Sequence, residues 1–410
     1  MKAFARPRRG LIPLVLVLGL ALAAPAGALT VQGLARGPAG EPLAGALVSD
    51  GRAVAMSDAA GRFRLSTEPG RAVWVCPPAG FAPPEPGWWP AEQAAAGRLE
   101  IALAAQAPRP AYRAALLSDP HLLDALAPTV NYPPPPGGHD LPLKVWRRVA
   151  GELHALRPDL TLVAGDLCMD GDEGDDAHAE AQLGLAARAL AELPRPALAI
   201  PGNHDARYRD QADPPAVDLA PWRRHLGPER RAARLGPTVW IAWDNLGRGA
   251  DAKGKPRALG ATPDEALAWL EALLAHLDPA TPLVLATHYP PASPLAGVNP
   301  LWRRNLVKAD SQSGLGLRDV DQNLARVARL LAGRRVLAWL HGHEHAHHET
   351  VLFLRQGPWR VLGLPAVCGR WWLGDRDWGP LAFIPAYLVL TLTPGPDGVG
   401  MASRAVEVQF

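Results

Sequence analysis

The sequence is poor in cysteine, with only Cys76, Cys168 and Cys368 among its 410 residues. An odd number of cysteines spread this widely excludes a framework of disulfide bonds. Cys168 lies near Asp166, but no partner cysteine is close to it in the sequence. We therefore interpret Cys168 as a small buried hydrophobic residue rather than as a metal ligand.

The sequence also lacks a surplus of basic residues. Its 42 Lys and Arg residues face 40 Asp and Glu residues, and without an N-terminal leader 38 basic residues would face the same 40 acidic ones. Binding to nucleic acid requires clustered Lys and Arg side chains that contact phosphates. We therefore expect no nucleic-acid partner for this chain.

No hydrophobic run suits a membrane crossing, which takes about 20 residues. The apolar run from Leu11 to Ala24 contains Pro13 and lies between a basic start and Ala26-Gly27-Ala28. This order predicts a signal peptide over residues 1–28, a periplasmic or secreted protein, and no transmembrane span once the leader is removed. An uncleaved anchor is the alternative. The pair Arg8-Arg9 leaves twin-arginine export open beside the general secretory route.

The sequence contains no internal repeat and no low-complexity block. Short strand-like runs separated by Gly, Pro and Asp turns fill residues 29–105, which we call the N-terminal module. Several short strands at close spacing predict a small all-β sandwich. Asp50 and Asp58 lie in Gly-containing turns, where Asp serves the backbone, so we expect no catalysis in this module.

Residues 110–410 show a different pattern, in which apolar runs alternate with helical stretches. Strands are predicted over residues 114–118, 160–165, 197–201, 238–243, 282–287, 336–340 and 361–367. Helices are predicted over residues 143–156, 177–193, 263–277 and 321–331. This alternation predicts a layered α/β domain.

Residues able to bind metals follow five of the predicted strands. The five motifs are Asp119-Pro120-His121, Gly165-Asp166, Gly202-Asn203-His204-Asp205, His288 and His341-Gly342-His343-Glu344-His345. Open α/β sheets bind ligands at the carboxyl ends of their strands. Each motif alone also has a structural explanation, and the histidines of 341–348 are compatible with a surface tract that binds metal adventitiously. Five such motifs, each at a strand end, predict one common site.

The chemistry of these side chains suits two metal ions. A carboxylate can bridge two cations, so we expect Asp166, which follows the compact Gly165, to be the bridging ligand. Oxygen and imidazole donors without a thiolate favour Mn, Fe or Zn as divalent or trivalent ions. Two such ions ~3.5–4 Å apart clamp an anionic substrate and turn a bridging water into hydroxide, which suits attack on phosphorus.

The motifs, in this order, resemble the calcineurin-like metallophosphoesterase superfamily over about residues 114–348. The N-terminal module is similar to prealbumin-like modules that accompany some bacterial members. The resemblance implies a four-layer α-β-β-α domain preceded by the small β sandwich. Its residue assignments are Asp119, His121 and His345 for one metal, Asn203, His288 and His343 for the other, Asp166 as the bridge, and His204 as proton donor or phosphate contact.

Departures from the family pattern bear on the subclass. Protein phosphatases of the superfamily carry an Asp three residues after the bridging one, but Met169 stands there and Asp170 follows, so whether Asp170 pairs with His204 is open. Arg207 and Tyr208 are candidate substrate contacts because they follow His204.

The sequence therefore predicts an exported metal-dependent hydrolase of phosphomono- or phosphodiester bonds in small molecules. A non-catalytic binding or scaffold protein built on the same domain is the alternative. The oligomeric state and the choice between monoesterase and diesterase stay open.

Overall fold

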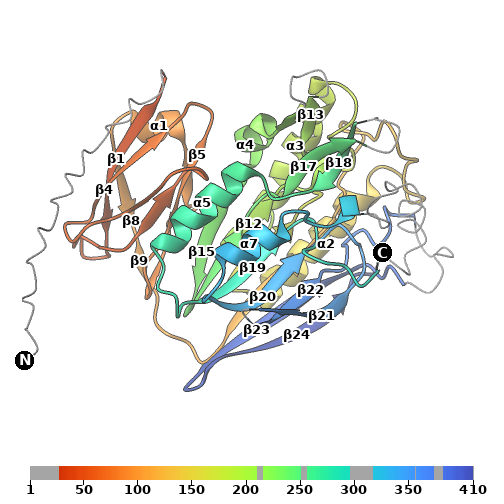
Figure 1. Cartoon of the computed structure of the whole chain (residues 1–410). Helices are drawn as coiled ribbons and strands as arrows, with labels where there is room; N and C mark the ends of the chain where they lie inside the picture. The colour runs from red at the N-terminus through yellow and green to blue at the C-terminus, as the bar shows by residue number, and fades with distance from the viewer. Residues whose placement is uncertain are drawn as a thin grey trace, which may run out of the picture.

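The computed structural model describes residues 27–209, 216–250, 256–295, 317–355, 357–373 and 382–409. All but the last two residues of the predicted signal peptide, 1–28, lie outside the described residues. Figure 1 shows a small region of strands with the short helix α1, in red and orange, beside a larger region of strands and helices. No described helix combines the length and the apolar composition that a membrane crossing requires.

The N-terminal module consists mainly of two small sheets, with strand orders β4-β1-β8 and β3-β2-β5-β7. Every second residue of β4 is buried, which places Phe63 and Leu65 in the module's apolar core. The bounds of its elements are β1 Leu29–Arg36, β2 Leu47–Ser49, β3 Val54–Met56, β4 Arg62–Thr67, β5 Ala72–Cys76, β6 Phe81–Ala82, β7 Trp88–Pro90, α1 Ala91–Ala95, β8 Arg98–Ala102 and β9 Ala104–Ala105.

The first sheet of the larger region has the order β12-β11-β10-β23-β24. Its bounds are β10 Tyr112–Leu117, β11 Leu160–Ala164, β12 Ala197–Ile200, β23 Ala386–Gly395 and β24 Gly398–Glu407. β10, β11 and β12 are parallel, whereas β23 and β24 are antiparallel to their neighbours. All residues of β11 and β12 are buried, as expected for parallel strands covered on both faces.

The second sheet has the order β15-β16-β19-β20-β22-β21, with β16, β19, β20 and β22 parallel. Its bounds are β15 Arg231–Leu235, β16 Thr238–Ala242, β19 Pro282–Thr287, β20 Arg335–His341, β21 His348–Leu354 and β22 Gly357–Gly363. The strand predicted over 361–367 ends at Gly363 instead. The chain then leaves the sheet, and the Val367 amide donates to the Ser118 carbonyl at 2.9 Å, at the end of β10 in the other sheet.

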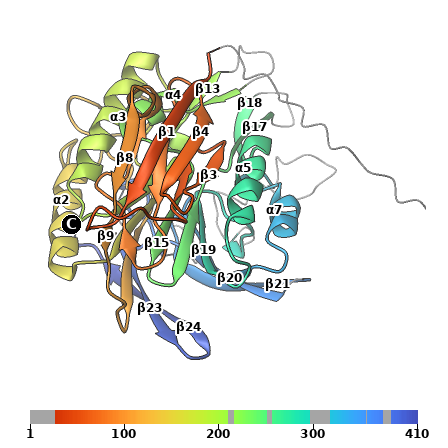
Figure 2. The same cartoon turned by 90° about the vertical axis from the view of Figure 1, so that its left-hand side faces the viewer.

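The two sheets pack face to face and are covered by helices on their outer faces (Figures 1 and 2). Leu116 and Leu162 of the first sheet share one apolar cluster with Trp240 and Val284 of the second. The helices α2 Leu141–Leu156, α3 Asp176–Ala191 and α4 Ala220–Leu226 cover the first sheet, and α5 Asp264–Ala275 and α7 Leu324–Leu330 cover the second. The predicted four-layer α-β-β-α domain preceded by an all-β region is confirmed.

Short elements complete the larger region. They are the pair β13 Arg207–Arg209 and β14 Ala216–Asp218, the pair β17 Leu246–Ala250 and β18 Pro256–Gly260, and the 3-10 turns η1 Asn203–Asp205 and η3 Leu317–Asp319. η1 directly follows β12, so a tight turn presents the Asn and His of the Gly-Asn-His-Asp motif at a strand end.

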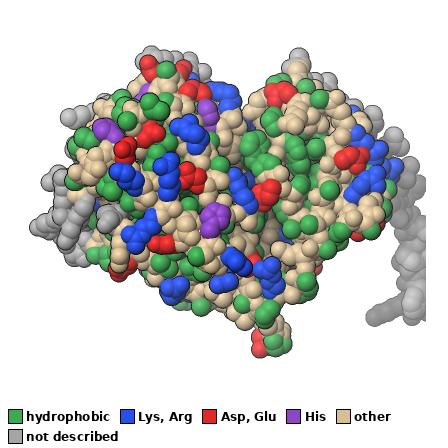
Figure 3. All heavy atoms as spheres, turned by 180° about the vertical axis from the view of Figure 1, so that it is seen from behind, with side chains coloured by type: hydrophobic (Ala, Val, Ile, Leu, Met, Phe, Trp, Pro, Cys, Tyr) green, Lys and Arg blue, Asp and Glu red, His purple; other side chains and the backbone are tan. Residues whose placement is uncertain are grey.

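The N-terminal module is fixed to the larger region by apolar and ionic contacts. Trp74 and Cys76 share an apolar cluster with Trp269 of α5, whose Nε1 donates to Ser49 Oγ at 3.1 Å. Figure 2 shows the module between the α3–α4 side and the α5 side of the larger region. Viewed from behind, a crease separates the two regions, and basic and acidic side chains are interspersed over that face (Figure 3).

Beside these apolar contacts lies a group of ion pairs that we call the interface ion cluster. It consists of Arg71 from the module and Arg223, Glu229, Arg230, Asp244 and Glu265 from the larger region. Arg71 Nη2 lies 3.2 Å from Glu229 Oε1, and both side chains are buried. Arg71 therefore crosses the boundary between the two regions, and with Arg223 and Arg230 it contacts three carboxylates of the larger region.

Candidate metal centre

The seven predicted metal ligands, which we call the ligand cluster, lie in loops that follow five parallel strands. Asp119 and His121 follow β10, Asp166 follows β11, Asn203 follows β12, His288 follows β19, and His343 and His345 follow β20. The stacked sheets bring these strand ends to one edge of the domain. Three of the ligands, Asp119, His121 and His288, have no exposed surface.

One group of donor atoms lies between the loops after β10 and β20. His121 Nε2 and His345 Nε2 are 3.1 Å apart, and His345 Nε2 is 3.4 Å from Asp119 Oδ1. Asp166 Oδ2 closes this group at 3.6 Å from His121 Nε2. Two imidazoles and two carboxylates therefore converge on one point.

A second group lies beside the first and shares one atom with it. His288 Nε2 is 3.3 Å from Asp166 Oδ2 and 3.1 Å from Asn203 Oδ1. His343 Nδ1 lies 3.1 Å from the same Asn203 oxygen. The structure thus brings all seven residues together in the two groups that the family resemblance implies, with Asp166 Oδ2 common to both.

The spacing of these donor atoms fits two metal ions. Ligands at about 2.0–2.2 Å from one ion, separated by angles of 90–110°, lie about 3–3.5 Å from each other. His288 Nδ1 donates to the Ala164 carbonyl at 2.9 Å, and His345 Nδ1 donates to the Gly369 carbonyl at 2.7 Å. These bonds fix the tautomer of each ring and leave its Nε2 lone pair free for an ion.

Backbone strain is concentrated at the same place. Eight described non-glycine residues have a positive φ, and five of them are predicted ligands with φ between 42° and 69°. These five are Asp119, His121, Asp166, His343 and His345. A left-handed backbone is unfavourable for side-chain-bearing residues and gathers at functional sites, where the surrounding structure compensates for it.

Two glycines allow the close approach of the strand ends. A Cβ atom at Gly165 would lie 2.4 Å from His288 Nδ1, and one at Gly202 would lie 2.2 Å from Asp166 Oδ1. Neither distance is compatible with a side chain. The glycines that precede Asp166 and Asn203 in the sequence therefore make room for the ligands of the neighbouring strands.

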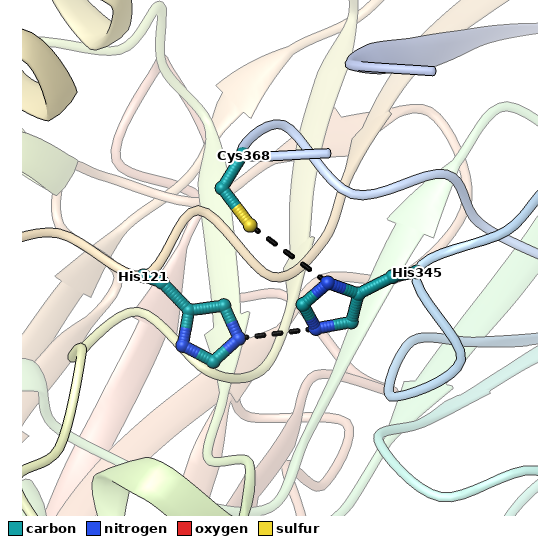
Figure 4. A group of neighbouring side chains, drawn as sticks. All are labelled: His121, His345 and Cys368. Atoms are coloured by element: carbon teal, nitrogen blue, oxygen red, sulfur yellow. Dashed lines mark hydrogen bonds between the residues drawn. The ribbon is translucent and has the colours of Figure 1, made fainter. Parts of the chain in front are cut away.

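Cys368 lies near the ligand cluster without belonging to it. Its Sγ is 3.8 Å from His345 Nδ1, whereas His121 faces Nε2 on the other side of the ring (Figure 4). An ion held by His345 Nε2 therefore has the imidazole between itself and the sulfur. Burial raises the pKa of the Cys368 thiol well above its usual value, so the group stays neutral. Cys168 is likewise fully buried.

His204 is buried against the ligand cluster and pairs with an aspartate that the sequence analysis did not identify. Its ring centroid lies 4.9 Å from that of His121, and its Nδ1 is 3.3 Å from Asp172 Oδ1. Burial lowers the pKa of His204, but the nearby Tyr132, Asp172 and Asp166 outweigh burial and raise it well above the usual value. These neighbours therefore favour the protonated form of the ring.

The sequence leaves undecided whether Asp170 pairs with His204, and the structure shows that Asp170 binds other residues. Its Oδ2 accepts hydrogen bonds from Thr129 Oγ1 and the Val130 and Asn131 amides, and its Oδ1 lies 3.0 Å from His178 Nε2. Asp170 thus ties residues 129–131, in the Pro-rich loop between β10 and α2, to His178 of α3. Asp172 reaches His204 because the chain turns between them, which sequence spacing alone does not reveal.

The two candidate substrate contacts differ in their environment. Arg207 Nη1 donates to the Glu173 carbonyl at 2.9 Å and its Nη2 to the Gly174 carbonyl at 3.1 Å, so its guanidinium fixes the loop that carries Asp172. The Tyr208 hydroxyl is buried and finds no hydrogen-bond partner among the described residues. Burial, followed by Asp172 and Asp166, raises the pKa of Tyr208 well above its usual value, so the hydroxyl keeps its proton.

Aromatic residues border the centre beside His204 and His345. The Tyr132 ring lies 5.8 Å from His204 and 5.4 Å from Trp371, whose ring is 5.9 Å from His345. Trp372 is in the core, and its Nε1 donates to the His121 carbonyl at 2.9 Å. Tyr132 could not be identified from the sequence, because it lies in a Pro-rich loop without a periodic pattern.

A family model described as calcineurin-like phosphoesterase matches residues 112–347, which is more than half of the chain. The chain belongs to the calcineurin-like phosphoesterase family. Members are metal-dependent phosphoesterases, and the described His and Asp groups of this chain are able to hold metal, so the chain is a metal-dependent hydrolase in the general sense. None of the curated proteins matches the chain.

Several solved structures are similar at low sequence identity. A dimetal phosphatase from Danio rerio is 12% identical, with a TM-score of 0.41, over 73% of this chain and 100% of that one. The protein TT1561 of Thermus thermophilus is 11% identical, with a TM-score of 0.34, over 73% and 99%. Phosphopantetheinyl hydrolase from Mycobacterium tuberculosis is 13% identical, with a TM-score of 0.32, over 66% and 99%.

Proposed function

We propose that the chain is an exported phosphoesterase that hydrolyses phosphate esters of small molecules at two metal ions bridged by Asp166. The observation that carries the proposal is the position of Asp166 Oδ2, 3.6 Å from His121 Nε2 and 3.3 Å from His288 Nε2. One carboxylate oxygen thus belongs to both donor groups. Two bound ions would clamp the anionic phosphoester and lower the pKa of a water between them.

The donor set indicates which ions fit. The ligand cluster offers imidazole nitrogens, carboxylate oxygens and one amide oxygen, and the thiol of Cys368 lies behind His345. This mixture of hard oxygen and borderline nitrogen donors suits Mn, Fe or Zn.

His204 would supply the proton that the leaving group needs. Asp172 stands 3.3 Å from its Nδ1 and favours the protonated ring. When the bond between phosphorus and the ester oxygen breaks, a proton from His204 neutralises the departing alkoxide. A contact of the same ring with a phosphate oxygen is the other role that its position allows.

The remaining residues around the centre suit a small substrate. The Tyr208 hydroxyl is buried and has no partner among the described residues, so it would reach an ester oxygen only if the side chains around it move. Tyr132 and Trp371 form an aromatic wall against which an organic leaving group can pack. Interspersed charges on the face seen in Figure 3 provide no basic stripe for a nucleic acid there.

Export is the second part of the proposal. It is supported by residues 1–28, in which a basic start is followed by an apolar run and then by small residues, as in a signal peptide. The test is expression of the full chain in a bacterial host, followed by fractionation and N-terminal sequencing. We expect a periplasmic or secreted protein that begins close to residue 29. A full-length protein in the cytoplasm, or one held in the membrane by the leader, would contradict this part.

The catalytic proposal is tested with bis(4-nitrophenyl) phosphate and 4-nitrophenyl phosphate in the presence of Mn²⁺. We expect turnover of at least one substrate and none after chelation, and the ratio of the two rates separates diesterase from monoesterase. Asp170→Asn serves as a control for metal content only, because this carboxylate binds no ion but holds the loop that carries Tyr132. Metal-loaded protein that turned over neither substrate would favour a non-catalytic binding protein on the same domain.

A further inference from the structure

A second cluster of metal-binding side chains lies beside the ligand cluster. His341 at the end of β20, Glu344 in the following turn and His348 at the start of β21 each offer one ligand atom, and these atoms lie within 4.8 Å of one another. We call these three residues the His341 cluster. His341 and Glu344 have no exposed surface, so this part of 341–348 is no surface tract.

The alternation of side chains along residues 341–348 separates the two sets of ligands. His343 and His345 face Asn203 and His121 in the ligand cluster. Glu344 lies between them in the sequence, and its side chain points away from the ligand cluster. Its Oε1 accepts a hydrogen bond from Ser293 Oγ, and its Oε2 lies 2.6 Å from His348 Nε2. The same short segment therefore presents donors to two different places.

His341 is prepared as a metal ligand. Its Nδ1 donates to the Gly342 carbonyl at 2.9 Å, which leaves the lone pair on Nε2. That Nε2 is buried, has no hydrogen-bond partner among the described residues and lies 3.7 Å from Glu344 Oε2. A metal-binding histidine typically has this arrangement, with one nitrogen bonded to a backbone carbonyl and the other directed at the ion.

Glu344 is a buried carboxyl group whose side-chain neighbours are the Ser293 hydroxyl and two imidazoles. In the part of the chain that the structure describes, its ion-pair neighbours are His341 and His348, and no Lys or Arg pairs with it. A buried carboxylate requires a cation or several hydrogen bonds to offset the loss of hydration. A metal ion between the three side chains would satisfy both the carboxylate and the unpartnered His341 nitrogen.

We propose that the His341 cluster binds a third metal ion, zinc, which is separate from the catalytic pair. Two imidazole nitrogens and one carboxylate oxygen form a ligand set that zinc accepts in proteins, with a fourth position left for water. The ion would tie β20 to β21 and so hold the turn that carries His343 and His345. This proposal does not depend on the reaction that the chain catalyses.

The test compares His348→Ala with His347→Ala in the full-length protein. His347 is the matched control because it is exposed and its Nδ1 bonds the Gly363 carbonyl, outside the cluster. After zinc loading and dialysis against metal-free buffer, elemental analysis should find one ion fewer per chain in His348→Ala. The His347→Ala protein should keep the wild-type content. Equal zinc contents in wild type and both variants would overturn the proposal.

Anomalous diffraction from zinc-loaded wild-type crystals locates the ion directly, whatever the folding of the variants. A peak about 2.0–2.2 Å from His341 Nε2, His348 Nε2 and a Glu344 oxygen is expected. Absence of this peak while the ligand cluster is occupied would overturn the third site alone. The Asp166→Asn protein should retain this peak, so failure of the catalytic proposal and failure of this one are distinguishable.

Discussion

The ligand cluster and the interface ion cluster are both groups of buried charged residues, yet they are built in different ways. At the interface, Arg71 and Arg223 both contact Glu229, and Arg230 contacts Asp244, so the positive and negative groups are matched. In the ligand cluster, Asp119 and Asp166 have imidazoles as their neighbours. Five ligand positions have a left-handed backbone, whereas no residue of the interface ion cluster does.

The difference shows what each group needs from outside the chain. The matched cluster balances its own charges and therefore needs no added ion. The ligand cluster brings donor atoms close together, and His121 Nε2 and His345 Nε2 lie 3.1 Å apart. Such an arrangement is favourable only with cations between the donors, and its backbone strain marks it as a functional site.

The largest effect on activity is expected for Asp166→Asn. A neutral amide bridges two cations poorly, so both catalytic ions should be lost. The loss of rate should exceed the ~10²–10⁴-fold that general acid catalysis supplies. Elemental analysis measures the metal content, and turnover of an aryl phosphate measures the rate. Retention of the full metal content in Asp166→Asn would contradict the bridging role, and Asp170→Asn controls for the loss of a buried carboxylate charge.

His204→Ala separates proton transfer from metal binding within the same site. We expect full metal content and a rate loss of ~10²–10⁴, largest for alkyl esters, whose leaving groups need a proton. A 4-nitrophenolate leaving group should suffer less. Asp172→Asn should reduce the rate less than His204→Ala, because the imidazole stays in place. An equal loss for both kinds of ester would assign His204 to phosphate binding, and loss of metal would make it a ligand.

Glu229→Gln tests the matched cluster and should leave metal content and turnover unchanged. The change removes one carboxylate from buried Arg71, which keeps Glu265 Oε1 at 3.4 Å and the Asp50 carbonyl. The free energy of unfolding should therefore fall at neutral pH by no more than about 3–5 kcal/mol, the cost of breaking a buried pair. Denaturant titration measures this loss. Glu100→Gln is a control from an exposed ion pair with Arg36 in the same module and should change stability little.

The pH dependence of this destabilisation follows from the pKa of Glu229. Burial raises that pKa, but Arg71, Arg223 and Arg230 outweigh burial and lower it below the ordinary value. The charge of Glu229 therefore stabilises the fold above the pKa of an unfolded glutamate, and the stabilisation is lost as the pH falls through the folded pKa. The difference between wild type and Glu229→Gln should shrink in acid. A difference independent of pH would show that the charge is not its cause.

The sequence predicted which residues gather at one edge of the sheets, because the signals for these positions are local. Each ligand follows a buried strand directly, and the strand predicted over 282–287 matches β19 in full. Pairs between distant loops escaped prediction, such as His204 with Asp172, because nothing in the residue spacing shows how a loop turns. The contact between Arg71 and Glu229 escaped for the same reason, since it depends on how the module lies against the larger region.

Anomalous diffraction from manganese-loaded crystals of wild type and His288→Ala tests the central claim most directly. For the wild type, the account predicts two peaks ~3.5–4 Å apart, both in contact with Asp166. The His288→Ala crystals should retain the peak beside Asp119, His121 and His345 and lose the other. A single peak in the wild type, or two peaks of which only one contacts Asp166, would contradict a dinuclear centre bridged by this carboxylate.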